Sequence, residues 1–216
     1  MKDNPAVSIN EIFYSIQGEA KNSGRPTVFI RTAGCPFRCS YCDTEYAFTE
    51  GNNIRINEII SKVKSFKTNF VTVTGGEPLA QKNIILLLNT LVDNSFNVSI
   101  ETSGLVDISA IPKNVEIVMD IKTPTSNESS KNIDNNLTAI KKTDVIKFVI
   151  GNEDDYKWSK KFITKNNLEH FENIFFSPVH DDLKISSIAD WILKDKLNVT
   201  LQLQLHKYIW GNERGR

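Results

Sequence analysis

The cysteines of this chain lie in one short segment, as Cys35, Cys39 and Cys42 with the spacing C-x3-C-x2-C. Thiolates are the ligands of iron–sulfur clusters, and three of them on one loop can hold three irons of a cubane cluster. The chain contains 3 cysteines in total, so no protein thiolate is left for the fourth iron. An open iron can bind and activate a small molecule, and the segment therefore predicts a catalytic cluster.

Zinc is the alternative metal that these cysteines could bind. A structural zinc site requires four nitrogen or sulfur ligands in a tetrahedron. The fourth would have to come from His170, His180 or His206, which are remote in sequence. Ligand count alone leaves zinc with an open position as an alternative.

A second segment of interest is Thr74-Gly75-Gly76-Glu77-Pro78, which follows an apolar run. A glycine pair after a strand can be an ordinary turn. It also lets a backbone approach a ligand closely because no Cβ interferes, and Glu77 could accept a hydrogen bond from an ammonium group. Taken alone, the segment allows both interpretations.

Three other polar positions each have a functional and a structural interpretation. Asp43 and Thr44 offer hard oxygens of the kind that magnesium prefers, or an ordinary helix N-cap. Arg31 ends an apolar strand, where its planar fork suits a substrate carboxylate or a structural salt bridge. Gln17-Gly18-Glu19 is either a hairpin turn or a segment that folds over the site with an amide and a carboxylate.

The C-terminal segment Val199–His206 alternates between leucines and the polar residues Gln202, Gln204 and His206. This pattern predicts a strand, either at a sheet edge with one wet face or with its polar face at the site. Lys147 interrupts the apolar strand Val145–Ile150. An ionisable group in such a strand is paired or functional.

Composition restricts the function classes. Lys+Arg 26 equals Asp+Glu 26, so the net charge is +0, and no basic excess points to nucleic acid or a membrane surface. The first residues, Met1 to Pro5, lack a signal-peptide apolar stretch. Closely spaced cysteines in odd number indicate a reducing compartment. We expect a soluble cytoplasmic protein that binds neither nucleic acid nor membrane.

Strand and helix patterns alternate along the chain. We expect helices over Ile56–Phe66, Gln81–Val92, Asp155–Asn166 and Ile185–Lys194, and a polar loop over Thr125–Asn136 before a short helix. The expected strands are rich in Val, Ile and Phe; they are Val28–Arg31, Phe70–Thr74, Asn97–Glu101, Glu116–Asp120, Val145–Ile150, Ile174–Ser177 and Val199–His206.

This alternation predicts an α/β fold, a partial or split β/α barrel with mostly parallel strands. Five unusual loops follow the strands, including the cysteine loop, the Gly75-Gly76 turn and Ser177-Pro178-Val179-His180. In such barrels the active site lies where strands end and loops begin. We expect one domain over 1–216, with residues 1–27 packing over the active site.

The cysteine spacing resembles the signature of the radical S-adenosylmethionine superfamily, and Gly75-Gly76-Glu77-Pro78 resembles its GGEP motif. The resemblance implies that the amino and carboxylate groups of S-adenosylmethionine chelate the open iron of a 4Fe-4S cluster. It also implies that electron transfer cleaves the sulfonium to give a 5′-deoxyadenosyl radical.

Taken together, the ordered motifs are similar to one family within it, the 7-carboxy-7-deazaguanine synthases of queuosine and 7-deazapurine biosynthesis. The matching segments are Ile12–Glu19, Phe29–Gly34, Cys35–Thr44, Thr74–Pro78, Glu101–Gly104 and Gln204–Ile209. The resemblance implies a carbon–nitrogen lyase that contracts the ring of 6-carboxy-5,6,7,8-tetrahydropterin to 7-carboxy-7-deazaguanine and releases ammonia.

The family's residue roles carry over to the matching positions. By resemblance Cys35, Cys39 and Cys42 hold the cluster and Thr44 binds magnesium. The residues expected around S-adenosylmethionine are Tyr41, Cys42, Asp43, Gly76, Glu77, Ser103, Asp120, Ile121, Lys122, Ser177, Pro178, Val179 and His180. The residues expected around the pterin are Ile16, Gln17, Gly18, Glu19, Arg31, Thr74 and His206.

The resemblance also implies a homodimer and an electron donor such as flavodoxin or ferredoxin. Two features depart from the family: Ala20 stands where QGEG is frequent, and the chain continues beyond Ile209. One hypothesis is that the arginines of this tail meet the substrate carboxylate. The competing functions are another radical enzyme, such as a glycyl-radical activating protein, and a non-catalytic electron carrier or zinc module.

Overall fold

A computed structural model describes residues 5–180 and 182–216 of the chain. Their strands form a 9-stranded sheet with the order β3-β1-β2-β4-β5-β6-β7-β8-β9. From β2 onward, neighbouring strands are parallel, whereas β1 runs antiparallel to both β2 and β3. The bounds are β1 Ala6–Ile16, β2 Pro26–Thr32, β3 Asn52–Arg55, β4 Phe70–Gly75, β5 Asn97–Thr102, β6 Glu116–Ile121, β7 Val145–Ile150, β8 Ile174–Pro178 and β9 Thr200–Leu201.

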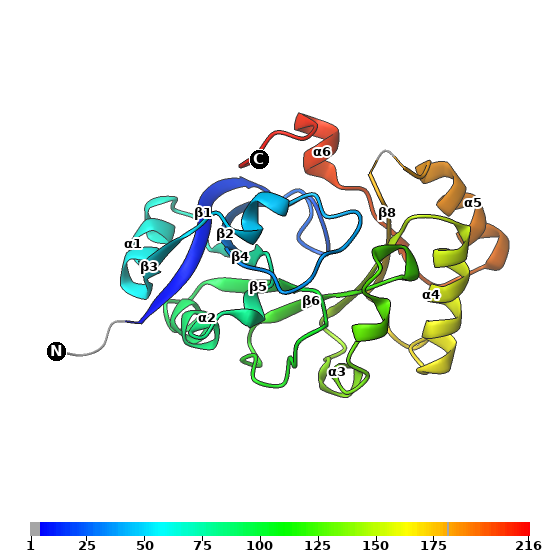
Figure 1. The fold of residues 1–216 in the computed structure, drawn as a ribbon, viewed down its shortest axis with the longest axis horizontal. Helices are drawn as coiled ribbons and strands as arrows, with labels where there is room; N and C mark the ends of the chain where they lie inside the picture. Colours follow the sequence, from blue (N-terminus) through cyan, green and yellow to red (C-terminus); the bar gives the residue numbers. More distant parts are fainter. Residues whose placement is uncertain (1–4, 181) are drawn as a thin grey trace.

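The helices follow the strands as the alternating pattern predicts. They are α1 Ile56–Ser65, α2 Ile84–Asp93, α3 Asn136–Ala139, α4 Glu153–Lys165, α5 Ile185–Asp195 and α6 Leu205–Trp210. Figure 1 shows α1 to α5 around one side of the curved sheet and α6 on another side, near the C-terminus. Among the described residues, no helix has the length and apolar character needed to cross a membrane.

Alternation along each parallel strand separates the core from a polar interior. In β2, Val28 and Ile30 are buried in the core beneath the helices, whereas Phe29 and Arg31 line a cavity on the other face. The same period of two places Lys147 in the cavity between the core residues Ile146 and Phe148 of β7. Arg31 and Lys147, which interrupt apolar strands, therefore face the cavity.

The predicted open β/α architecture is confirmed. Each of the seven predicted strands overlaps a strand of the parallel part of the sheet, and each of the four predicted longer helices is present. The order begins at β3 and ends at β9, so the barrel is open. Sequence reasoning missed β1, because it assigned the N-terminal segment to a cover over the site rather than to the sheet. It also missed β3, a short strand whose residues are mostly polar and exposed.

The predicted strand Val199–His206 is wrong beyond Leu201. β9 covers Thr200–Leu201 only, and α6 begins at Leu205. In the register Phe176↔Leu201, β8 reaches only two residues further, to Pro178, which has no N–H to donate. The last predicted strand residues, from Gln204 on, would therefore have no strand opposite them. The backbone N–H of Leu205 instead donates to Gly18 (3.0 Å), which turns the chain toward the cavity.

Candidate active site

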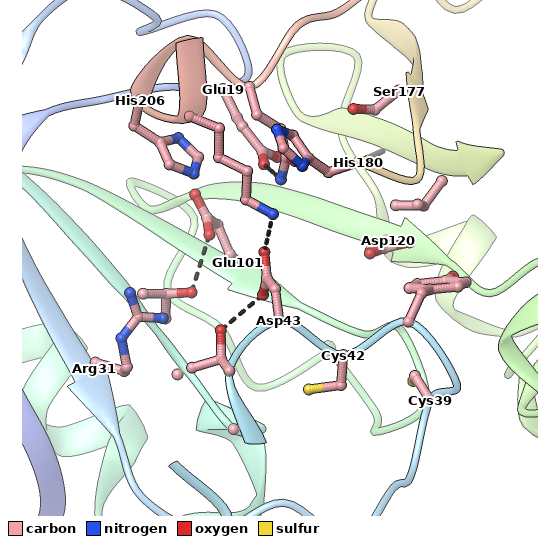
Figure 2. A pocket seen from close by; sticks show the side chains of 18 of the residues that line it. Glu19, Arg31, Cys39, Cys42, Asp43, Glu101, Asp120, Ser177, His180 and His206 are labelled. Atoms are coloured by element: carbon pink, nitrogen blue, oxygen red, sulfur yellow. Dashed lines mark hydrogen bonds and ion pairs between the residues drawn. The ribbon is translucent and has the colours of Figure 1, made fainter. Parts of the chain in front are cut away.

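A cavity of about 660 Å³ lies at the carboxyl ends of the parallel strands. Side chains from β2, β4, β5, β6, β7 and β8 line it, together with the cysteine loop and α6. Figure 2 shows Cys39 and Cys42 on one side of this cavity and His206 of α6 on the other. Cys35, Cys39 and Cys42 therefore share one cavity with Arg31, Glu101 and His206, which come from distant parts of the chain.

The three cysteines are half-buried free thiols. Burial is the main cause that raises the pKa of each thiol. Neighbouring cysteines raise the pKa of Cys35 and Cys39 further, and the charge of Asp43 raises that of Cys42. A tetrahedral zinc site needs ligands that converge on one point, and no three His, Cys, Asp or Glu side chains of residues 5–180 and 182–216 do so. Three thiols on one loop beside an open cavity fit a cluster that is held by thiolates alone.

The Gly75-Gly76 turn packs the strand end against the cysteine loop. Gly75 has φ +132°, and a Cβ there would lie 2.3 Å from the backbone of Thr32. A Cβ on Gly76 would lie 2.2 Å from the carbonyl oxygen of Gly34. These glycines are therefore required by contacts within the protein, although both also line the cavity.

Glu77 does not line the cavity, contrary to the expectation that it contacts a cofactor. Its side chain is 0% exposed. The carboxylate accepts hydrogen bonds from Leu79 N (3.0 Å), Thr102 Oγ1 (2.8 Å), Ser103 N (2.9 Å) and Ser103 Oγ (2.5 Å). Glu77 therefore joins the turn after β4 to the loop after β5. Of the hydrogen-bonded residues Glu77 and Ser103, only Ser103 lines the cavity.

Asp43 and Thr44 place oxygens in the cavity beside Cys42. Thr44 Oγ1 donates to Asp43 Oδ1 at 2.8 Å, and Lys207 Nζ lies 2.8 Å from Asp43 Oδ2. Partial desolvation opposes the charge on Asp43, but Lys207 and Thr44 outweigh it and lower its pKa to about 2. Thr44 holds the N-cap position of the 3₁₀ turn Glu45–Phe48 without a side-chain capping bond, so capping does not explain its hydroxyl.

Asp120 and Lys122 form an ion pair at the end of β6, with Nζ 2.9 Å from Oδ2. The other carboxylate oxygen, Asp120 Oδ1, is buried without a hydrogen-bond partner. A buried acceptor without a donor is costly unless a ligand satisfies it. Because Asp120 lines the cavity, this oxygen fits the hydroxyl or amino donors of S-adenosylmethionine.

Glu19 is the centre of a buried network that joins the two ends of the chain. Its carboxylate contacts Lys147 Nζ (2.7 Å), Gln204 Nε2 (2.7 Å) and Gln202 Nε2 (3.2 Å). Burial opposes its charge, but Lys147 and Gln204 lower its pKa below the usual range. The predicted hairpin segment is therefore both a connection between β1 and β2 and part of the cavity wall.

Ala20, next to this network, has φ 55°. Its N–H donates to Gln202 Oε1 at 2.6 Å. This left-handed conformation favours glycine, which is the residue that the family resemblance leads us to expect here. The departure at Ala20 therefore falls on a position where an alanine is strained.

Glu101 is a cavity residue that sequence reasoning did not assign to the site. Thr74 Oγ1 donates to its Oε2 at 2.9 Å, and Gln17 Nε2 lies 3.3 Å from its Oε1. Burial first, and then the charge of Glu19, raises the pKa of Glu101. Its place at the end of β5, level with the other polar strand ends, was the signal that could have identified it.

Arg31 lines the cavity and also forms the structural ion pair that was its alternative role. Its Nε lies 2.8 Å from Glu11 Oε1 of β1. The guanidinium lies over the ring of Phe13, which stacks on Phe29 with centroids 5.0 Å apart. This aromatic floor with an adjacent guanidinium suits a planar ring that carries a carboxylate.

His206 enters the cavity from α6 and packs on Gly18. A Cβ on Gly18 would lie 2.0 Å from His206 Nδ1, so only glycine allows this approach. Burial lowers the pKa of His206, although the carboxylate of Glu19 opposes the shift. A neutral imidazole offers one donor and one acceptor to a ligand.

The tail after α6 also lines the cavity, from Gly211 to Arg216. The guanidinium of Arg214 lies 3.9 Å from the ring centroid of Tyr46, and its Nη1 is 2.9 Å from Glu50 Oε2. Its Nε is 3.6 Å from Glu11, the partner of Arg31. Arg214 thus fastens the tail across the cavity rim.

Most of the predicted site residues meet in this one cavity. Gly18, Glu77 and Ile121 do not line it, and Ile121 is a core residue with 3% exposure. The predicted residues that line it are Ile16, Gln17, Glu19, Arg31, Cys35, Cys39, Tyr41, Cys42, Asp43, Thr44, Thr74, Gly76, Ser103, Asp120, Lys122, Ser177, Pro178, Val179, His180 and His206.

Comparison with known proteins gives relatives that match nearly the whole chain. A family model described as the radical SAM superfamily matches residues 29–142. A 7-carboxy-7-deazaguanine synthase of Chlorobaculum tepidum is 40% identical over 214 residues, which are 98% of this chain and 97% of the relative. One of Clostridium acetobutylicum is 42% identical over 214 residues, with 95% and 97% coverage.

Among solved structures, QueE from Escherichia coli matches with a TM-score of 0.75 and 21% identity, covering 91% of this chain and 94% of that one. Streptococcus suis SuiB bound to the precursor peptide SuiA matches with a TM-score of 0.59 and 12% identity, covering 84% of this chain and 49% of that one. At these identities the likeness shows the fold alone.

Proposed function

The chain belongs to the 7-carboxy-7-deazaguanine synthases of the radical SAM superfamily, and we propose the residues with which it carries out that activity. It is a carbon–nitrogen lyase that converts 6-carboxy-5,6,7,8-tetrahydropterin to 7-carboxy-7-deazaguanine. The observation that carries the proposal is the shared cavity of Cys35, Cys39 and Cys42 with Arg31 and His206. The relatives favour this function over a glycyl-radical activating protein.

Cys35, Cys39 and Cys42 would hold the 4Fe-4S cluster. When bound, the cluster and S-adenosylmethionine supply one-electron chemistry that no side chain provides. The unpaired oxygen of Asp120 and the backbone of Gly76 would bind S-adenosylmethionine. The proposed remaining contacts are Tyr41, Asp43, Ser103, Lys122, Ser177, Pro178, Val179 and His180, all of which line the cavity.

The pterin would lie between β1, β2 and α6. Arg31 would bind its carboxylate, while Gln17, Thr74 and Glu101 would bind its ring edge through their amide, hydroxyl and carboxyl groups. The raised pKa of Glu101 lets it share a proton with a ring nitrogen. His206 would close the opposite side, and the tail would help to exclude water.

Magnesium is part of the proposal through Thr44 and Asp43. The lowered pKa of Asp43 keeps a carboxylate beside the Thr44 hydroxyl. Two hard oxygens leave most positions of an octahedral ion to water and substrate, which is the usual pattern for magnesium. Magnesium would therefore orient the substrate carboxylate at this end of the cavity.

The partners and setting are proposed from the family resemblance and composition. We propose one domain over 1–216, a homodimer, a cytoplasmic location and an electron donor such as flavodoxin or ferredoxin. The zero net charge supports a small-molecule enzyme without a nucleic-acid partner. Sedimentation of the purified protein tests the dimer, and electron transfer from each reduced donor tests the reductant.

The deciding experiment incubates the anaerobically reconstituted protein with reductant, magnesium, S-adenosylmethionine and 6-carboxytetrahydropterin. We expect 7-carboxy-7-deazaguanine by mass spectrometry, and none from Cys39→Ala. If 5′-deoxyadenosine forms without that product, the substrate assignment is wrong. If a cluster-loaded protein gives neither compound, the electron-carrier alternative is favoured; zinc without iron and sulfide would favour the zinc module.

A further inference from the structure

The cysteine loop has little regular structure of its own, and a segment far along the chain holds it. This segment, Thr125–Lys131, includes the 3₁₀ turn Ser129–Lys131 and lies after β6. The N–H of Ser40 donates to Ser126 O at 3.2 Å, and Ser40 Oγ donates to Thr125 O at 2.5 Å. Contacts between the two segments therefore reach inside the C-x3-C-x2-C motif.

The central contact is made by Glu128, which neither the sequence motifs nor the cavity lining identifies. Its Oε1 accepts a hydrogen bond from the backbone N–H of Arg38 at 2.8 Å, between Cys35 and Cys39. Glu128 is 5% exposed, and Lys131 Nζ lies 2.5 Å from Oε2. Lys131 in turn lies over the ring of Phe37, at 5.7 Å from its centroid.

The side chain of Arg38 fastens the same turn from within. Its Nη1 donates to the carbonyl oxygens of Cys35 (2.7 Å) and Phe37 (2.6 Å), and its guanidinium lies 4.2 Å from the centroid of Phe48. With this internal bracing, the bond to Glu128 anchors the turn between the first two cysteines to the segment Thr125–Lys131.

We propose that Glu128 is a positioning residue for the cluster, because it holds the Cys35–Cys39 turn in the geometry that three iron ligands require. The inference rests on the proposed cluster at Cys35, Cys39 and Cys42. Fixing a loop before its ligand binds removes the ordering cost from binding. A loop without this anchor would release a bound cluster more readily, although the thiols are unchanged.

Three variants separate the hydrogen bond from the ion pair. Glu128→Ala removes both, and Glu128→Gln keeps an oxygen that can accept from Arg38 N–H. Lys131→Ala removes the ion pair and the contact with Phe37 but keeps the hydrogen bond. Glu153→Ala is the matched control, because Glu153 is 56% exposed and pairs with Lys157 on α4. Ser40→Ala removes a second, independent side-chain contact of the loop, the hydrogen bond to Thr125 O, and keeps the backbone bond to Ser126 O.

The measurement is the anaerobic rate of iron release to EDTA from reconstituted protein, together with the melting temperature of the protein before reconstitution. We expect Glu128→Ala to lose iron about tenfold faster, as loss of a buried charge-assisted hydrogen bond allows. Glu128→Gln and Lys131→Ala should stay within about twofold of wild type, and Ser40→Ala should lie between. Before reconstitution, Glu128→Ala should stay folded and melt only a few degrees below Glu153→Ala, since one buried hydrogen bond is lost.

If Glu128→Ala releases iron at the wild-type rate, the positioning role is wrong. It is also wrong if Glu128→Gln releases iron as fast as Glu128→Ala. A wild-type protein that takes up no iron would overturn the cofactor and this role together. Iron retention that follows the expected order, in a protein that makes no 7-carboxy-7-deazaguanine, would leave the role intact and reject only the proposed substrate.

Discussion

The ammonium of Lys147 lies 2.7 Å from the carboxylate of Glu19, which is 128 residues earlier in the chain. Lys147 is in the middle of β7, and Glu19 follows β1. This pair connects the parallel sheet to the segment that closes one side of the cavity. Burial opposes the charge on Lys147, but Glu19 and Asp120 raise its pKa, so both members are charged at neutral pH.

Removing one member of this pair should be strongly destabilising. Lys147→Met leaves the Glu19 carboxylate buried without its cation, and we expect a loss of about 3–5 kcal/mol in the free energy of unfolding. The double variant Glu19→Gln with Lys147→Met should lose less than the sum of the single variants. Urea unfolding measures all three, with Lys157→Met at an exposed pair as control; additive losses would refute the coupling.

Glu77 should behave as a structural residue of the fold. Its four hydrogen-bond donors fill both carboxylate oxygens. In Glu77→Gln an NH2 group replaces one carboxylate oxygen, and it then faces a backbone N–H from which it cannot accept a hydrogen bond. We therefore expect a loss of about 1–3 kcal/mol in unfolding free energy. The change should already appear in protein without cluster or S-adenosylmethionine. Unchanged stability, alongside weaker S-adenosylmethionine binding, would instead return Glu77 to the cofactor contacts.

His206 should make stability depend on pH. Burial lowers its pKa below 6.5, so the unfolded chain takes up a proton before the folded one does. The contribution of His206 to stability is then fully present above its pKa in the unfolded chain, and it falls as the pH drops below that value. We expect His206→Asn to flatten the profile of unfolding free energy between about pH 5 and pH 7. The exposed His170→Asn variant should keep the wild-type profile, and a parallel change in both would exclude His206 as the source.

Ala20 offers a stabilising substitution. Its φ of 55° carries strain of about 1 kcal/mol that glycine avoids, whereas glycine adds about 0.5 kcal/mol of unfolded-state entropy. We expect Ala20→Gly to raise the unfolding free energy by about 0.5 kcal/mol. Ala139→Gly, at the exposed last residue of the short helix α3, is the control and should lower it by no more than the cost of glycine in a helix interior. Lower stability in Ala20→Gly would show that its methyl contacts outweigh the strain.

Arg214 should control the order of the tail. Arg214→Ala removes the contacts with Tyr46, Glu50 and Glu11, so we expect faster hydrogen exchange over residues 205–216. Because these contacts are partly exposed, global stability should change by less than about 1 kcal/mol. Arg216→Ala, which loses an exposed pair with Glu213, is the control. Pterin affinity that survives truncation after Ile209 would exclude the tail arginines as substrate contacts.

Much of the architecture could be predicted because it depends on local patterns. Apolar runs such as Val145–Ile150 predict buried strands, and the stripe of Ile56–Phe66 predicts a helix, since each buries one surface at the period of its backbone. The pattern failed at Val199–His206, where alternation continues but the neighbouring strand ends at Pro178. A strand needs a partner along its length, and local sequence does not state where the partner stops.

The sequence by itself determined the chemistry: the three thiols, the family and the strand ends at which polar residues gather. Only the tertiary structure decided the partners of those residues. It closed Glu77 inside the protein, paired Arg31 with Glu11, brought Glu101 into the cavity and placed Glu128 behind the cysteine loop. The physical reason is that a buried polar group must find partners, and long-range packing, not neighbouring sequence, determines which partners lie within reach.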